Sequence, residues 1–150
     1  MIEIMLSVAM SCLNVPYVWG GNHPLEGLDC SGYVLFCLKS IGEYPGRDMA
    51  AQKIFEYFHK KNYRSQLTRG SLLFFGADRY HIDHVEIAIS DRYMIGASGG
   101  DSSTRTVEEA IKRGAMVQIK PIASRGGLQG VIKLEEKGKD SIENYFASFK

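Results

Sequence analysis

The segment Gly27-Leu28-Asp29-Cys30-Ser31-Gly32-Tyr33-Val34 carries the strongest structural signal in this chain. A glycine-containing loop passes here into an apolar run with helical spacing, so we predict that a helix begins at Cys30. The unpaired N–H groups and the positive dipole end of such a helix favour thiolate over thiol and should lower the cysteine pKa. Because thiolate is the nucleophilic form, Cys30 is a candidate for covalent catalysis.

A second chemical feature is His84, which opens the alternating run His84-Val85-Glu86-Ile87-Ala88-Ile89. Alternation of apolar and polar residues predicts a strand, and a histidine on it could serve as the general base for a thiol. His81 and Asp83 share one face of that strand while His84 lies on the other. With no further ligand cluster in sight, we predict neither a metal nor a cofactor.

The composition is that of one soluble globular domain. The chain has 150 residues, of which 45% are hydrophobic and 23% charged, enough to bury a core. Lys and Arg number 18 against 17 Asp and Glu, and this balance predicts neither nucleic acid nor a membrane surface as partner. Three cysteines are a poor disulfide framework, and Cys12 and Cys37 are predicted to be buried small hydrophobes.

The order of the predicted elements indicates the fold class. Apolar spacing predicts helices over residues 2–13, 30–40, 49–60 and 107–113, loops over 22–28 and 96–104, and strands over 72–75, 84–90, 93–95, 116–121 and 131–134. Helices followed by antiparallel strands predict an α+β fold in which N-terminal helices pack on a central antiparallel sheet. We expect one catalytic domain over residues 1–135 and a charged helix or tail over residues 136–150.

Three stretches, in this order, resemble the NlpC/P60 family of papain-like cysteine peptidases. They are Pro16-Tyr17-Val18-Trp19-Gly20-Gly21 (family pattern P-Y-x-x-G-G), Leu28 to Val34 (D-C-S-G-[FY]-V), and Arg69 to Phe75 with His84 to Ile89 (P-G-D-L-[VL]-F-F and H-V-[GA]-I-Y). The resemblance covers roughly residues 2–100. It implies a papain-like NlpC/P60 fold and hydrolysis of amide bonds in peptidoglycan stem peptides, of the D-glutamyl–diamino acid type.

The resemblance also implies roles for individual residues. Cys30 matches the nucleophile and His84 the general base. Tyr17 matches a tyrosine whose hydroxyl lines the site and helps to stabilise the oxyanion, together with N–H groups at the start of the Cys30 helix. Asp29 matches a residue that can hold the free amine of the substrate, and Ser31 beside it is a second candidate for substrate binding.

The chain departs from the family pattern at the third catalytic position. The family usually has a polar residue there, often histidine, which holds the imidazole in its productive tautomer. Aligned from His84, that position falls at Gly96, which has no side chain. We favour a backbone carbonyl or a water as the substitute, with Ser98 as the next candidate and Asp101, folded back from its loop, as a third.

Other functions and the place of action stay open. A papain-like amidase or acyltransferase on another substrate is one alternative, and a catalytically weak binding or assembly module, favoured by Gly96, is another. The N-terminus lacks a basic signal-peptide region and carries Glu3, so synthesis in the cytoplasm is expected. A small form without a leader suggests a phage-encoded enzyme in a tail or lysis assembly, acting in a virion or on the bacterial cell wall.

Overall fold

A computed structural model describes residues 1–135, so the expectation of a helix or tail over residues 136–150 lies outside the described residues. The order of elements is α1 (Ile2–Ser11), β1 (Asn22–His23), β2 (Gly27–Leu28), α2 (Cys30–Lys39), α3 (Ala51–Lys60), β3 (Leu72–Gly76), β4 (Ile82–Ala88), β5 (Tyr93–Ser98), α4 (Val107–Arg113), β6 (Met116–Pro121), a 3-10 turn η1 (Ile122–Ser124) and β7 (Leu128–Ile132). The predicted α+β class is confirmed. None of the described helices has the length and hydropathy of a bilayer span.

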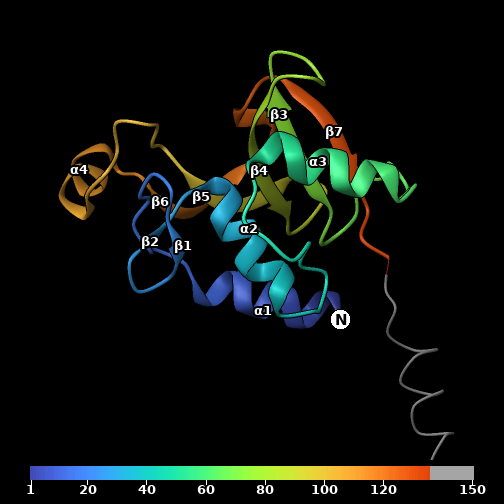
Figure 1. Ribbon diagram of the computed structural model, residues 1–150, viewed down its shortest axis with the longest axis horizontal. Helices are drawn as coiled ribbons and strands as arrows, with labels where there is room; N and C mark the ends of the chain where they lie inside the picture. The colour runs from blue at the N-terminus through green and yellow to red at the C-terminus, as the bar shows by residue number, and fades with distance from the viewer. Residues whose placement is uncertain (136–150) are drawn as a thin grey trace, which may run out of the picture.

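A five-stranded antiparallel sheet in the order β6-β5-β4-β3-β7 forms the centre of the fold. Helix α2 packs on β4 and β5, and α3 packs on β4 and β7. In Figure 1, α3 crosses in front of β3 and β4, while α4 lies at the end of the molecule opposite β7. Alternation along the strands sends Phe74 into the main core under the helices and Phe75 into a smaller cluster with Leu73, Ala88 and Met94. The sheet therefore carries a buried apolar cluster on each face.

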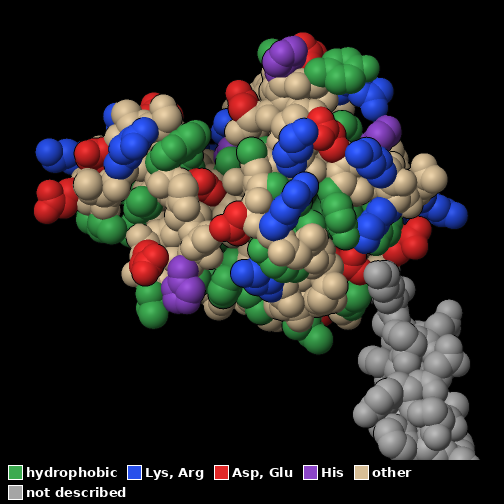
Figure 2. All heavy atoms as spheres, in the orientation of Figure 1, with side chains coloured by type: hydrophobic (Ala, Val, Ile, Leu, Met, Phe, Trp, Pro, Cys, Tyr) green, Lys and Arg blue, Asp and Glu red, His purple; other side chains and the backbone are tan. Residues whose placement is uncertain are grey.

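Helix α3 illustrates why these residues form these elements. Ala51, Ile54, Phe55 and Phe58 recur at helical spacing and are buried, which gives the helix one apolar stripe. Its other face is polar, and Figure 2 shows Lys and Arg side chains gathered over the part of the surface where α3 lies. Burial of the stripe is what holds the helix to the sheet.

Several predicted boundaries are corrected by the structure. The predicted loop over residues 96–104 is wrong at its start, because β5 continues to Ser98, which pairs with Met116 of β6. The predicted loop over residues 22–28 contains the β1–β2 hairpin. The predicted strand over 84–90 runs instead from Ile82 to Ala88, and that over 131–134 from Leu128 to Ile132. In each case the ends of a strand depend on where it pairs with its neighbour. The residue pattern of one strand alone does not contain that information.

Truncation of Phe74 tests the main core. The side chain is fully buried, and its ring lies 5.2 Å from that of Phe55 between centroids. Phe74→Ala should lower the free energy of unfolding by about 3–5 kcal/mol, because a large buried ring leaves a cavity. Denaturant unfolding followed by circular dichroism measures this change. Leu25→Ala is the control, since Leu25 is 90% exposed and its loss should cost less than about 0.5 kcal/mol.

Candidate active site

Cys30 is the first residue of α2, and Asp29 caps that helix. Oδ1 of Asp29 accepts a hydrogen bond from the N–H of Gly32 at 2.8 Å and one from the Ser31 hydroxyl at 3.2 Å. Oδ2 accepts from the N–H of Gly20 at 2.9 Å. The carboxylate therefore ties the Gly20-Gly21 turn to the beginning of α2 and fixes where Cys30 stands. This capping role is one that the sequence analysis did not assign to Asp29.

Two glycines allow the turn and the helix to touch. A Cβ on Gly32 would collide with the carbonyl oxygen of Gly21, and a Cβ on Gly21 would collide with the carbonyl oxygen of Gly27. Gly20 has a φ of +77°, a left-handed conformation that glycine adopts without strain. The glycines of the P-Y-x-x-G-G and D-C-S-G patterns thus permit close backbone contact at the base of the site.

The sulfur of Cys30 lies against the backbone of β4. It is 3.8 Å from the carbonyl oxygen of Asp83, and the N–H of Val85 also donates toward it. These two groups flank His84 in the chain. The Cys30 side chain is nearly enclosed, with the residue 8% exposed. The structure therefore brings the predicted nucleophile and the strand segment that carries the predicted base together.

The predicted lowering of the Cys30 pKa is wrong for the resting site. Burial raises the pKa of the Cys30 thiol to about 12, and the Asp29 carboxylate adds to the increase. Hydrogen bonds from the N–H groups of Val85 and Ser31, and the charge of Arg125, act in the opposite direction but are smaller. Desolvation of a thiolate outweighs the helix N-terminus here, so Cys30 rests as a thiol.

His84 is held by Glu86. Both side chains are buried on β4, and the His84 Nε2 lies 2.8 Å from Oε2 of Glu86. Because a carboxylate only accepts hydrogen bonds, this contact places the ring hydrogen on Nε2 and leaves Nδ1 as the basic nitrogen. Glu86 was not among the predicted site residues. The signal that could have identified it is an acidic residue two positions after His84, on the same face of the strand and followed by the apolar Ile87, Ala88 and Ile89.

The candidates proposed for the third position lie elsewhere. Ser98 is buried on β5, but its hydroxyl has no hydrogen-bond partner among residues 1–135. Asp101 accepts hydrogen bonds from Ser103 and from Arg113, at 2.6 Å and 3.0 Å, in an exposed loop. Gly96 lies beside Glu86: a Cβ there would approach its Cδ and Oε1 to 2.8 Å. Ser98 as orienter stays a prediction, with no contact to His84 among the described residues.

Tyr17 completes the predicted set. It lines the same cleft as Cys30, and it is buried at 4% exposure. Its ring lies under Gly100, where a Cβ would come within 2.6 Å of Cε1. Burial, reinforced by nearby Cys30 and Asp29, raises the pKa of the Tyr17 phenol above its usual range. The hydroxyl therefore keeps its proton at neutral pH and can donate a hydrogen bond to a developing oxyanion.

Tyr17, Asp29 and Cys30 line a cleft of about 570 Å³, which also reaches Asp83, the residue before His84. Its walls come from the Tyr17–Asn22 turn, the start of α2, the segment before α3 and the beginning of β4; they include Tyr17, Trp19, Asp29, Cys30, Ser31, Asp48, Ile82 and Asp83. Trp19, one of the lining residues, is half exposed. A cleft of this size with a thiol and several polar groups suits a small peptide-like ligand. Among the described residues no group of three or more His, Cys, Asp or Glu could hold a metal ion.

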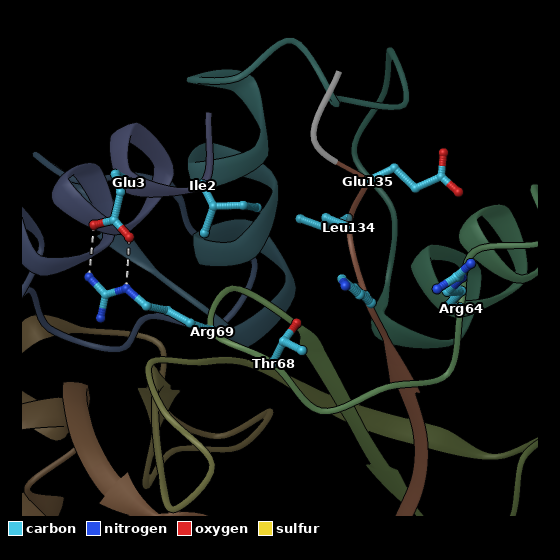
Figure 3. Close-up of a pocket in the computed structure, with 8 residues that line it drawn as sticks. Ile2, Glu3, Arg64, Thr68, Arg69, Leu134 and Glu135 are labelled. Carbon is cyan, nitrogen blue, oxygen red and sulfur yellow. Dashed lines mark hydrogen bonds and ion pairs between the residues drawn. The ribbon is translucent and has the colours of Figure 1, made fainter. Parts of the chain in front are cut away.

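A second hollow, of about 620 Å³, lies away from Cys30 (Figure 3). Arg69 and Glu3 lie together on one side of it, where Arg69 makes two hydrogen bonds to the Glu3 carboxylate, at 2.8 Å and 2.9 Å. Arg64 and Glu135 stand on its other side. Its lining includes no cysteine and no histidine. Size alone would favour this hollow, but Cys30, the candidate nucleophile, lines the smaller cleft.

The raised pKa of Cys30 predicts how its alkylation depends on pH. The iodoacetamide rate at Cys30, followed by mass spectrometry, should keep rising from pH 7 to pH 10, because the buried thiol loses its proton only near pH 12. In urea the same thiol should titrate near the ordinary value of about 8.5. A full alkylation rate already reached below pH 7 would instead indicate a preformed thiolate.

Gly32→Ala tests the contact between the turn and α2. Alanine in a helix is intrinsically better than glycine by about 1 kcal/mol, yet here its Cβ would meet the carbonyl of Gly21. We expect overpacking to lower the free energy of unfolding by about 1–3 kcal/mol, as measured by denaturant titration. Gly126→Ala is the matched control, since nothing lies within 4 Å of its added Cβ. A more stable Gly32→Ala protein would contradict this account.

Comparison of the sequence with known proteins identifies two relatives named as endopeptidases. The probable endopeptidase YafL of Escherichia coli is 35% identical over 85 residues, which cover 55% of this chain and 34% of YafL. The murein DD-endopeptidase MepH of E. coli is 29% identical over 98 residues, covering 62% of this chain and 35% of MepH. The chain thus spans about a third of the length of these relatives.

Solved structures share the fold. The peptidoglycan hydrolase RipB of Mycobacterium tuberculosis superimposes with a TM-score of 0.65 at 23% identity, over 90% of this chain and 65% of RipB. RipD of the same organism, described as a non-catalytic NlpC/p60 domain protein, gives 0.60 at 15% identity, over 89% of this chain and 97% of RipD. The model of the NlpC/P60 family matches residues 14–120, most of the chain. The chain belongs to the NlpC/P60 family.

Proposed function

We propose that this protein is a cysteine endopeptidase that hydrolyses amide bonds in the stem peptides of peptidoglycan. The observation that carries the proposal is the position of the Cys30 sulfur, at the start of α2 and against the β4 backbone on either side of His84. A binding module has no need for a thiol and an imidazole held in this way. The relatives named as endopeptidases support the substrate class.

The nucleophile would form by proton transfer within the site. The Cys30 thiol passes its proton to Nδ1 of His84 as the sulfur attacks the scissile carbonyl carbon. The carbon becomes tetrahedral, and its oxygen takes the negative charge. Because the thiol is buried, free thiolate does not accumulate before substrate arrives. The thiol is instead deprotonated by His84, as general base, during the attack.

The tetrahedral intermediate would be stabilised by two kinds of donor. The N–H of Cys30 lies at the start of α2, where Asp29 already takes the N–H of Gly32, and the protonated hydroxyl of Tyr17 lines the same cleft. The imidazolium then gives its proton to the leaving amine, the C–N bond breaks, and a thioester to Cys30 forms. Water, deprotonated by His84, hydrolyses the thioester and restores the thiol.

The family resemblance supports a proposal for the type of bond that is cleaved. We propose a D-glutamyl–diamino acid linkage, whose free amine would be met by Asp29 with Ser31. Both residues line the cleft, and the Asp29 carboxylate also caps α2. A phage tail or lysis assembly as partner, and the virion or cell wall as place of action, stay predictions from the sequence.

Digestion of purified peptidoglycan tests the activity and names the bond. Wild-type protein should release cut stem peptides, and Cys30→Ala should release none, because no other cysteine reaches the cleft. Loss of a nucleophile typically costs several powers of ten in rate. Mass spectrometry of the fragments identifies the cleaved linkage.

Cys12→Ala is the matched control, since Cys12 is also a buried free cysteine but lies at the end of α1. It should keep wild-type activity. If folded wild-type protein releases nothing from several wall types, the peptidase proposal fails for those substrates. Binding to the wall without cleavage would then favour the binding-module alternative.

A further inference from the structure

We propose that Glu86 is the positioning residue for His84, and that it does from β4 what the family's third residue does from β5. This inference rests on the proposed function, because it assigns a role within the same site. It concerns a residue that stands where the family pattern H-V-[GA]-I-Y has glycine or alanine.

The contact itself is buried and direct. Nε2 of His84 lies 2.8 Å from Oε2 of Glu86, with the side chains 6% and 0% exposed. Two residues apart on one strand, both side chains project from the same face of the sheet. Phe75 of β3 packs beside the imidazole, with its ring centroid 6.0 Å away. The ring is therefore held at Nε2 by a carboxylate and along one side by an aromatic ring.

The missing side chain of Gly96 provides the space for Glu86. The register that pairs Ile87 with Ile95 puts Glu86 beside Gly96 on the neighbouring strand. A Cβ on Gly96 would lie 2.8 Å from both Cδ and Oε1 of Glu86. A side chain at residue 96 and the observed Glu86 conformation thus exclude each other. Relative to the family pattern, the polar residue is therefore on β4 (Glu86) and the small residue on β5 (Gly96). The imidazole of His84 still has one hydrogen-bond acceptor.

The chemistry of the pair fits a positioning role. A carboxylate at Nε2–H fixes the tautomer with its lone pair on Nδ1, and it stabilises the imidazolium that forms when His84 takes the Cys30 proton. The group is enclosed, so this attraction is weakly screened by solvent. Glu86 is not among the residues that line the cleft, and its hydrogen bond is to His84, so it would act through His84.

A purely structural role explains the arrangement less well. Oε1 of Glu86 has no hydrogen-bond partner among residues 1–135, and a buried carboxylate with an unpaired oxygen is a poor device for stability. A further ionisable group near Glu86 is Tyr33 of α2, whose pKa is raised, chiefly by burial, far above its usual range. Its hydroxyl donates to the carbonyl of Ala9 at 3.0 Å. Tyr33 therefore stays neutral, and the hydrogen bond of the Glu86 carboxylate is to His84.

Alkylation of Cys30 in Glu86→Gln tests the role without any substrate. Glutamine keeps the size and polarity of the side chain but removes its charge. At pH 7 thiolate forms only if His84 takes the proton, so the iodoacetamide rate should fall tenfold or more. At pH 10 loss of the thiol proton directly to solvent is about a thousandfold more favourable than at pH 7. This route does not need His84, so the two proteins should agree within about twofold. The thermal unfolding midpoint, measured alongside, confirms that the variant is folded.

Exchanging the residue types at positions 86 and 96 should restore the alkylation rate. Glu86→Gly should slow alkylation at pH 7 like Glu86→Gln, and the double variant Glu86→Gly with Gly96→His should recover at least tenfold of that loss. Gly96→Ala alone should also slow the reaction, because its Cβ displaces the carboxylate, whereas Gly126→Ala should not. On peptidoglycan, kcat should follow the same order while KM stays nearly constant.

The outcomes separate this inference from the proposed function. Equal alkylation rates at pH 7 in folded wild type and Glu86→Gln would overturn the role of Glu86, as would parallel losses at pH 7 and pH 10, which indicate general loosening. If wild type cleaves no peptidoglycan yet Glu86→Gln slows alkylation only near neutral pH, the peptidase proposal fails and the positioning role stands. If Glu86→Gln does not fold, Gly96→Ala and the exchanged variant decide the question.

Discussion

Close backbone contact between the Gly20-Gly21 turn and the start of α2 is the constraint on which the active site depends. Gly32 lets the carbonyl of Gly21 approach the helix, and Asp29 bridges the two with hydrogen bonds to Gly20 and Gly32. The same contact fixes the direction of the first turn of α2, and therefore of the Cys30 sulfur toward β4. Loss of any one of these backbone contacts would move the thiol relative to the strand.

Burial gives this site its electrostatic character. An exposed cysteine at a helix N-terminus would be expected to ionise readily, but enclosure against β4 raises the pKa of Cys30 to about 12. The same enclosure keeps the Tyr17 hydroxyl protonated and strengthens the attraction between His84 and Glu86. Burial thus favours the neutral thiol at Cys30, and under the proposed mechanism the proton would leave sulfur when the imidazole accepts it.

The positions of the helices, and of Cys30 at the start of α2, were predicted well from the sequence, because the signals for them are local. The apolar stripe of α3 and the passage from loop to helix at Cys30 are contained in a dozen residues each. The extent of β5 was missed, because Ser98 is held by its pairing with Met116, some eighteen residues further on. The direction of the Cys30 pKa was also missed, since burial is a property of the assembled fold.

The third catalytic position shows why one strand is not enough to predict a site. In an antiparallel sheet, a ring can be reached by the residue two positions along its own strand or by one on the neighbouring strand. A family pattern compares each position separately, and at Gly96 it shows only that the usual polar side chain is missing. The observation that matters is the pair: Gly96 is small where Glu86 is large, and both occupy one space. A polar residue that disappears from one strand should therefore be sought at the positions that its absence makes room for.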